Sequence, residues 1–316
     1  MKILFTFLPS EEMAEELKAG FKGCEFEFHR DIQSASRCLT EAEVLVTFGE
    51  DLTEDHIVQA RQLRWIMVIS AGLELMPLEM IKEKGILVTN VKGIHAIPMA
   101  EFAFGLMLQH AKQLAKIREE VKQGLWQREV PGLELCGQNL LVLGAGAIGG
   151  EIARLGKAFR MNVSGINTSG KITENFDDMY TLDEMGGALG KADYVISILP
   201  STKETRYILK KEHFQRMKSS AVFINIGRGD LFKSSILIEA LKNGELAHAF
   251  LDVFETEPLE ENHPFWRMNK VTVTPHLSSR TKQYLPRSFA IFKKNLTTYT
   301  TNGNDYINEI DTERGY

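Results

Sequence analysis

Three segments in the second half of the chain each place ionisable side chains just after a short apolar run. Arg228 lies between two glycines in Asn-Ile-Gly-Arg-Gly, and His276 ends the motif Thr-Pro-His. Between them, the segment Asp-Val-Phe-Glu-Thr-Glu-Pro carries three carboxylates: Asp252, Glu255 and Glu257. Taken alone, each residue is compatible with a surface turn or a hydrogen-bonded loop. Because loops at the carboxyl ends of parallel strands share one edge of a sheet, we expect the three segments to meet there.

Together, these residue types are suited to interconverting a ketone and an alcohol. A histidine can donate or accept the proton of the alcohol as a general acid or base, and a neighbouring carboxylate favours the protonated imidazolium. An arginine can bind a substrate carboxylate through two N–H groups and polarise the adjacent carbonyl. The set Arg228, Glu257 and His276 therefore predicts a 2-keto or 2-hydroxy acid as substrate, with a hydride donor bound nearby.

A glycine-rich loop at residues 144–149 predicts the site of that hydride donor. It follows the apolar run Asn139–Leu143 and precedes a helical pattern over Gly150–Phe159. In this context its glycines permit a tight turn, backbone approach to a pyrophosphate and close packing of helix on strand. The helix N-terminus favours phosphate groups, and a plain tight turn is the alternative. We expect a nicotinamide dinucleotide to contact Gly144, Gly146, Ala147, Ile148 and Gly149.

The segment after the next predicted strand bears on the choice of dinucleotide. An NAD-preferring site has a carboxylate there for the ribose hydroxyls, but this chain has Asn167, Thr168, Ser169 and Lys171. Hydroxyl groups and a lysine suit a 2′-phosphate, which a carboxylate would repel. We therefore predict that NADP(H) is preferred and that NAD(H) can be used; a site indifferent between the two is the alternative.

Alternating strand and helix patterns predict an α/β fold with parallel sheets to position these loops. Expected helices include Glu11–Ala19, Thr53–Ala60 and Ile291–Thr300, with one long helix from Pro98 to Gly124 that lies in a core or against a second subunit. The strands are too many for one compact sheet and predict two domains. They are expected at Lys2–Phe7, Val44–Thr47, Trp65–Ile69, Leu87–Thr89, Asn139–Leu143, Asn162–Ile166, Tyr194–Ile198, Ala221–Asn225, Ala247–Leu251 and Val271–Val273.

The composition argues against several other classes of protein. The 316 residues are 44% hydrophobic and 25% charged with a net charge of −5, and they contain no basic block of the kind that binds nucleic acid. No apolar stretch is as long as a membrane span, and the first residues are typical of a strand rather than a signal peptide. The three cysteines, Cys24, Cys38 and Cys136, form no metal-ligand pattern and favour a reduced, cytoplasmic setting.

Seven motifs, in this order, resemble the D-2-hydroxyacid dehydrogenases, which act on D (R) isomers. They are S-A-G-L-E at 70–74, P-M-A-E at 98–101, G-A-G-A-I-G at 144–149, L-P-S-T-K-E-T at 199–205, N-I-G-R-G at 225–229, D-V-F-E-T-E-P at 252–258 and T-P-H-L-S-S at 274–279. The resemblance implies two doubly wound domains. One is a flavodoxin-like substrate domain at 1–96, to which 285–316 return, and the other is a Rossmann NAD(P)-binding domain at 97–284. It also implies a homodimer formed through the nucleotide-binding domain and the long helix.

The resemblance further implies roles for individual residues. Arg228 corresponds to the substrate-binding catalytic arginine, His276 to the acid/base and Glu257 to its partner, whereas Glu255 matches no role. NAD-using members of the family carry an aspartate at the position of Asn167. The remaining contacts implied are Asp252 with the nicotinamide carboxamide, Leu199, Pro200 and Thr205 with the adenine and phosphate side, the backbone of Ile226 with the nicotinamide, and the N–H groups of Ala71 and Gly72 with the substrate carboxylate.

Two functions stay open at this point. The first is an enzyme that reduces small 2-keto acids, and the second is a non-catalytic, dinucleotide-sensing protein similar to the corepressors related to this family. The absence of long disordered extensions favours the enzyme, and nothing favours the family's phosphonate or formate oxidation. Substrate choice is expected to depend on first-domain loops, where an apolar wall for a hydrocarbon tail, or simply core packing, is indicated by Phe48, Leu73, Leu75 and Met76.

Overall fold

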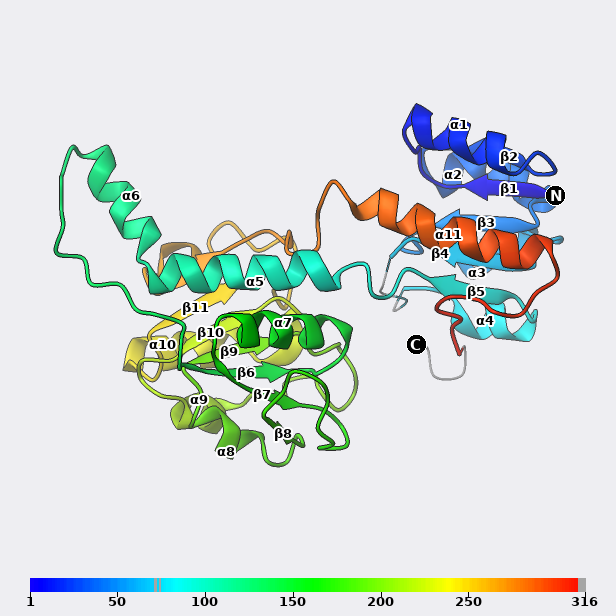
Figure 1. The fold of residues 1–316 in the computed structure, drawn as a ribbon. Coiled ribbons are helices and arrows are strands. Elements are labelled where there is room, and N and C mark those ends of the chain that lie inside the picture. Colours follow the sequence, from blue (N-terminus) through cyan, green and yellow to red (C-terminus); the bar gives the residue numbers. More distant parts are fainter. Residues whose placement is uncertain (71–72, 74, 312–316) are drawn as a thin grey trace. The chain divides into compact units, whose positions relative to one another are not determined.

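The protein forms two compact α/β units in a computed structural model that describes residues 1–70, 73 and 75–311 (Figure 1). Unit 1 comprises Met1–Ile94 together with the described residues from Lys282 onward, and unit 2 comprises His95–Thr281. Each unit contains one parallel sheet with helices on both faces, so the predicted fold class is confirmed. Within the described ranges, no helix has the length and apolar character needed to cross a membrane.

The sheet of unit 1 has the strand order β2-β1-β3-β4-β5, which is the flavodoxin-like order. Helices α1 (Glu11–Gly20) and α11 (Tyr284–Thr300) cover one face, where Ile3 and Phe5 of β1 pack, and Leu4 packs on the opposite face. The second face is covered by α2 (Ile32–Ala35), η1 (Ser36–Glu41), α3 (Glu54–Gln59) and α4 (Leu78–Glu83). The strands are β1 (Lys2–Phe5), β2 (Glu25–Phe28), β3 (Val44–Thr47), β4 (Trp65–Val68) and β5 (Leu87–Asn90).

The sheet of unit 2 has the order β12-β11-β10-β9-β6-β7-β8, in which the strand order reverses at β6, as in a Rossmann fold. Helices α5 (Ala96–Ala111) and α7 (Ala147–Ala158) pack on one face. The other face carries α8 (Met185–Leu189), α9 (Lys211–Arg216) and α10 (Ser234–Asn243). The strands are β6 (Asn139–Leu143), β7 (Asn162–Ile166), β8 (Asp178–Tyr180), β9 (Tyr194–Ser197), β10 (Val222–Asn225), β11 (His248–Leu251) and β12 (Val271–Val273). Short 3-10 helices, η2 (Gly229–Leu231) and η3 (Pro264–Arg267), follow β10 and precede β12.

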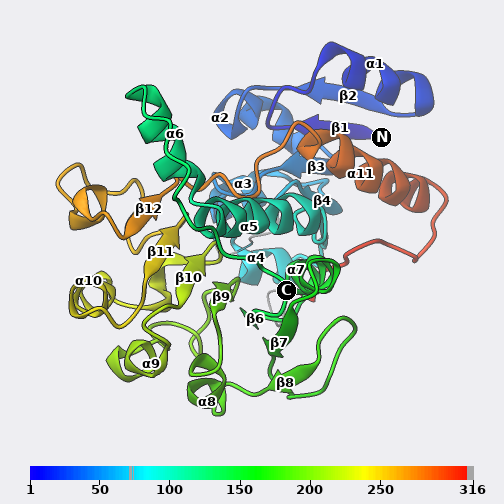
Figure 2. The ribbon, with the colours of Figure 1, turned by 60° about the vertical axis from the view of Figure 1, so that its left-hand side comes forward.

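The prediction of one long helix from Pro98 to Gly124 is wrong. Helix α5 ends at Ala111, and a separate helix α6 (Leu114–Lys122) begins after Gln113, whose φ of 52° is left-handed. The segment that returns after α6 explains why the helix ends at Ala111. The N–H of Leu133 donates to the Ala111 carbonyl at 2.7 Å, and a continuous helix would use that carbonyl for its own hydrogen bond. Apolar periodicity continues across the break and therefore does not reveal it. Figure 2 shows α6 standing away from the rest of unit 2.

Two strands, β2 and β8, are absent from the sequence prediction. Both are edge strands of their sheets, and each has only partly buried or exposed positions. An edge strand packs on fewer neighbours, so its sequence need not be a continuous apolar run. Nine of the ten predicted strands are buried at three or more positions, whereas the tenth, β12, is partly buried throughout.

Candidate active site

The glycine loop joins β6 to α7 at the carboxyl end of the unit 2 sheet. Gly144 has a φ of 107°, which only glycine adopts easily, and its N–H bonds to the Ile166 carbonyl of β7. A Cβ on Gly149 would lie 2.1 Å from the Gly144 carbonyl oxygen, whereas one on Gly146 would meet nothing within 4 Å. The third glycine thus permits close packing, and the second leaves its backbone open to a ligand. This arrangement fits a pyrophosphate at the N-terminus of α7.

The loop after β7 is folded around the side chain of Asn167. Its Oδ1 accepts hydrogen bonds from the N–H groups of Ser169 at 3.1 Å and Gly170 at 2.7 Å, and its Nδ2 donates to the Lys171 carbonyl at 2.9 Å. The loop therefore forms a tight turn that leaves Thr168, Ser169 and Lys171 at or near the surface. A carboxylate at position 167 could accept the same two N–H groups but would add a negative charge there.

The loop after β9 carries the other residues expected on the adenine and phosphate side. Leu199 is buried, and the hydroxyl of buried Thr205 donates to the Pro200 carbonyl at 2.5 Å and accepts from the Thr202 N–H at 2.8 Å. Thr205 thus shapes the loop from inside. Ile226, after β10, is also buried, and its N–H bonds to the Ser197 carbonyl of β9, so its carbonyl is the backbone group left for a ligand.

The two glycines around Arg228 allow neighbouring backbones to approach. A Cβ on Gly227 would lie 2.9 Å from the Leu199 carbonyl oxygen, and one on Gly229 would lie 1.9 Å from the backbone of Phe254. Neither glycine has a positive φ, so close packing on neighbouring backbones, rather than an unusual backbone conformation, explains their presence. The buried amide of Asn225 adds hydrogen bonds to the Arg228 carbonyl at 2.9 Å and from the Gly227 N–H at 3.2 Å. Sequence reasoning gave Asn225 no role.

Glu257 and His276 lie together on neighbouring loops. The His276 Nδ1 is 2.8 Å from one carboxylate oxygen of Glu257, and the other oxygen accepts the Phe254 N–H at 3.0 Å. Because Gly229 packs on Phe254, contacts run continuously from the Arg228 loop to the histidine. Both side chains are partly exposed, His276 at 49% and Glu257 at 36%, so the imidazole is open to a ligand.

Asp252 fixes the backbone that carries His276. This aspartate is 1% exposed, and its carboxylate accepts the N–H groups of Leu277 and Ser278, each at 2.9 Å, and the hydroxyl of Thr274 at 2.5 Å. The His276 N–H also donates to the Asp252 carbonyl at 2.9 Å. Holding this turn accounts for the buried aspartate independently of any contact with nicotinamide, and Thr274 is a second participant that sequence reasoning missed.

Glu255, which matched no family role, caps a helix. Its carboxylate accepts the N–H of Ser234, the first residue of α10, at 2.6 Å. A carboxylate at a helix N-terminus satisfies a free N–H group and interacts favourably with the helix dipole. Glu255 therefore ties the loop that carries Glu257 to α10.

The residues of unit 1 that were expected to contact substrate differ in what the structure shows of them. Ala71 and Gly72 lie outside the described residues. Leu73 and Met76 are buried in the core of unit 1, at 4% and 8% exposed, so they follow the core-packing alternative rather than forming an apolar wall. Leu75 is 69% exposed.

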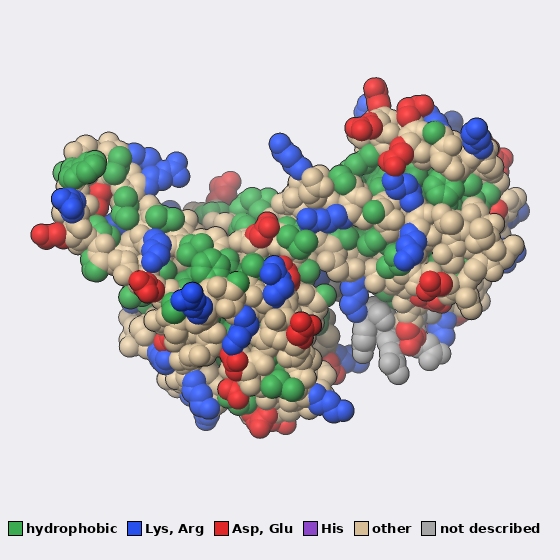
Figure 3. Space-filling view, in the orientation of Figure 1, with side chains coloured by type: hydrophobic (Ala, Val, Ile, Leu, Met, Phe, Trp, Pro, Cys, Tyr) green, Lys and Arg blue, Asp and Glu red, His purple; other side chains and the backbone are tan. Residues whose placement is uncertain are grey.

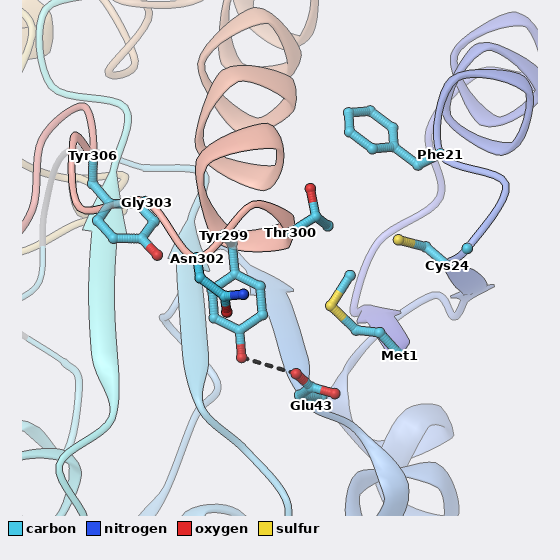
Figure 4. A pocket seen from close by; sticks show the side chains of 10 residues that line it. Met1, Phe21, Cys24, Glu43, Tyr299, Thr300, Asn302, Gly303 and Tyr306 are labelled. Atoms are coloured by element: carbon cyan, nitrogen blue, oxygen red, sulfur yellow. Dashed lines mark hydrogen bonds between the residues drawn. The ribbon is translucent and has the colours of Figure 1, made fainter.

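A cavity of about 780 Å³ in unit 1 lies at the opposite end of its sheet from the expected substrate loops. Its lining includes Met1, Cys24 and Glu43, each one residue before a strand, and Tyr299 of α11 donates to Glu43 at 3.0 Å (Figure 4). Ligands of open α/β sheets bind at the carboxyl ends of the strands. We therefore do not assign the catalytic chemistry to this cavity.

Comparison with known proteins agrees with the geometry. A model of the D-isomer specific 2-hydroxyacid dehydrogenase NAD-binding domain matches residues 104–278. Glyoxylate reductase of Aeropyrum pernix is 33% identical over 82% of this chain and 80% of that protein. D-3-phosphoglycerate dehydrogenase of Methanocaldococcus jannaschii is 34% identical over 78% of the chain, which spans 47% of that longer protein.

A solved structure is similar along nearly the whole length. The D-isomer specific 2-hydroxyacid dehydrogenase family protein from Aeromonas salmonicida has a TM-score of 0.88 at 31% identity, covering 98% of this chain and 99% of that one. The match therefore includes both units, not the dinucleotide-binding unit alone. The chain belongs to the D-isomer specific 2-hydroxyacid dehydrogenase family, whose members are enzymes that use a nicotinamide dinucleotide.

Proposed function

We propose that the protein transfers a hydride between NADP(H), or less efficiently NAD(H), and a small 2-keto acid or D-2-hydroxy acid. The observation that carries the proposal is the 2.8 Å contact between His276 and Glu257. His276 follows β12 and Glu257 follows β11, and β11 is the neighbour of β10, the strand that precedes Arg228. The glycine loop of the same unit fits the dinucleotide, and unit 1 is proposed as the substrate domain.

The side chains supply the proton and hold the substrate. The bound dinucleotide provides the hydride. Glu257 accepts a hydrogen bond from His276 Nδ1, which leaves Nε2 to donate a proton to the substrate oxygen during reduction and to remove it during oxidation. Arg228 binds the substrate carboxylate and polarises the adjacent carbonyl. Asp252 and Glu255 keep the two loops in place through the bonds described above.

The cofactor prediction follows from the Asn167 loop. We expect catalytic efficiency with NADPH to exceed that with NADH by at least about tenfold, because Lys171 and two hydroxyl groups can bind a 2′-phosphate. Asn167→Asp should reverse the preference by repelling the phosphate and accepting the ribose hydroxyls. Initial rates with both cofactors over glyoxylate, hydroxypyruvate, pyruvate and branched 2-keto acids give both ratios.

The same rates, together with a fluorescence titration of NADPH binding, separate the enzyme from the sensor. Turnover of at least one keto acid supports the proposed function, whereas binding of NADPH without turnover of any of them would favour the non-catalytic alternative. A tenfold preference of the wild-type protein for NADH would contradict the NADP(H) proposal while leaving the reaction intact.

We also propose that α6 and the following segment pack against a second copy of the chain. No residue of α6 is buried, and apolar side chains gather on it (Figure 3). Contiguous exposed apolar surface of this kind is typical of a protein interface. The largest exposed fractions are 63% for Val121, 52% for Leu125, 89% for Trp126 and 54% for Leu133.

Val121→Lys is expected to convert a dimer into a monomer. In sedimentation, the wild-type mass should be twice 35.7 kDa and that of the variant about 35.7 kDa, because a buried lysine would be left without its hydration. Val58→Lys is the matched control, since Val58 is also exposed, at 53%, but lies on α3 of unit 1. A monomeric wild-type protein, or a Val121→Lys variant that stays dimeric, would refute the proposed interface.

A further inference from the structure

A thiol, an imidazole and a carboxylate lie together at the edge of the unit 1 sheet, away from every motif used above. They belong to Cys38, His29 and Glu27, and one potential ligand atom from each lies within 4.8 Å of the other two. Glu27 lies on the edge strand β2, and His29, two residues later, continues its pairing through an N–H to the Phe5 carbonyl. Residues two apart along a strand share one face. Cys38 lies on η1, which follows α2.

We propose that Glu27, His29 and Cys38 bind one divalent transition metal ion of the zinc type, with water completing the coordination. Thiolate, imidazole and carboxylate are the ligands that Zn²⁺ takes, and three protein ligands with one water is a common open site. Bond lengths of about 2.0–2.3 Å in a tetrahedral site place neighbouring ligand atoms about 3.3–3.7 Å apart. The His29 Nε2 and Glu27 Oε2 atoms are already 3.5 Å apart.

The three side chains are partly buried but reachable from solvent. The side chains of His29 and Glu27 are 23% and 28% exposed, and Cys38 is partly buried. The Cys38 thiol hydrogen-bonds to Glu27. A metal ion would replace the thiol proton, so binding should release a proton. The donor set is thus prearranged by hydrogen bonds that a metal ion can replace.

The surrounding charges are compatible with a divalent cation. Lys2 bonds to the other Glu27 oxygen at 2.9 Å and to Glu41 at 2.8 Å. Two carboxylates and one ammonium give a local charge of −1 while His29 and Cys38 are neutral. A divalent ion that displaces the thiol proton brings this sum to zero. Lys2 therefore leaves room for the ion but weakens its binding, and the bound ion would tie the edge strand β2 to η1.

Titration with Zn²⁺ against a chromophoric chelator tests the site in the full-length protein. We expect one tight equivalent, and Cys38→Ser should weaken it by more than the about 10–100-fold that loss of an outer metal-site partner costs. Lys2→Met should tighten binding. Substitution with Co²⁺ should give a thiolate-to-metal charge-transfer band that Cys38→Ser abolishes and that His29→Ala weakens.

Matched variants separate this site from other ligands in the chain. Cys24→Ser and Cys136→Ser remove the other two thiols, and His276→Ala removes the histidine beside Glu257. All three variants should still bind one equivalent of Zn²⁺ and show the charge-transfer band with Co²⁺. Keto-acid reduction by Cys38→Ser should equal that of the wild-type protein, which reports correct folding. Absence of the band in the wild-type protein, or equal Zn²⁺ affinity in Cys38→Ser, would overturn the proposal and leave a purely hydrogen-bonded cluster.

Discussion

Replacing His276 with alanine is expected to lower kcat for keto-acid reduction by about 10²–10⁴-fold, the range that a positioned general acid contributes. The imidazole is held by Glu257 at 2.8 Å, and its backbone is fixed by Asp252, so removing the ring leaves the loop intact. Cofactor binding should therefore change little. Stopped-flow single turnovers measure the chemical step, and NADPH fluorescence titration measures the dissociation constant of the cofactor.

The matched control for this variant is His56→Ala. His56 is a histidine of unit 1 whose ring hydrogen-bonds to Thr53 at the start of α3, and its loss should leave kcat within about twofold of the wild-type value. Turnover by His276→Ala close to that of the wild-type protein would exclude the acid/base assignment. A large rise in the NADPH dissociation constant would instead indicate that the loop had moved.

Most strands could be predicted from the sequence because they are buried on both faces. Residues 44–47 and 222–225, for example, are buried at every position, and such runs are unambiguous when helical patterns separate them. The edge strand Glu25–Phe28 and the break at Gln113 could not be predicted in this way. Both depend on contacts with segments distant in sequence, namely β1 for the strand and residues 131–133 for the break.

The same distinction applies to the candidate site, where some residues could be predicted from the sequence and their supporting contacts could not. Motifs place Arg228, Glu257 and His276 at strand ends, and parallel pairing then brings their loops to one edge of the sheet. The supporting contacts are invisible in the sequence, because Gly229 is required by the backbone of Phe254 and Glu255 by the N-terminus of α10. The proximity of Cys38 to His29 likewise depends on how η1 folds back beside β2.

Replacing Arg228 with alanine is expected to lower kcat/KM by about 10²–10³-fold, or about 3–4 kcal/mol of transition-state stabilisation. A charged group that binds a substrate carboxylate and polarises its carbonyl acts in both the ground state and the transition state, so KM should rise and kcat should fall. Arg228→Lys should recover only part of the loss, because an ammonium cannot form two parallel hydrogen bonds to a carboxylate.

Chemical rescue makes this prediction specific to the guanidinium group. Added guanidinium ion should raise the rate of Arg228→Ala but not that of His276→Ala, whereas a variant with a distorted loop would gain nothing. Arg206→Ala is the matched control, since Arg206 is 59% exposed and pairs with Asp230, two residues from Arg228, at 3.0 Å. Because the Arg206 side chain lies largely in solvent, the pair should contribute little to stability, and the kinetics of the variant should be near those of the wild-type protein. If Arg228→Ala kept both kcat and KM within about threefold of the wild-type values, substrate binding would have to be assigned to another cation.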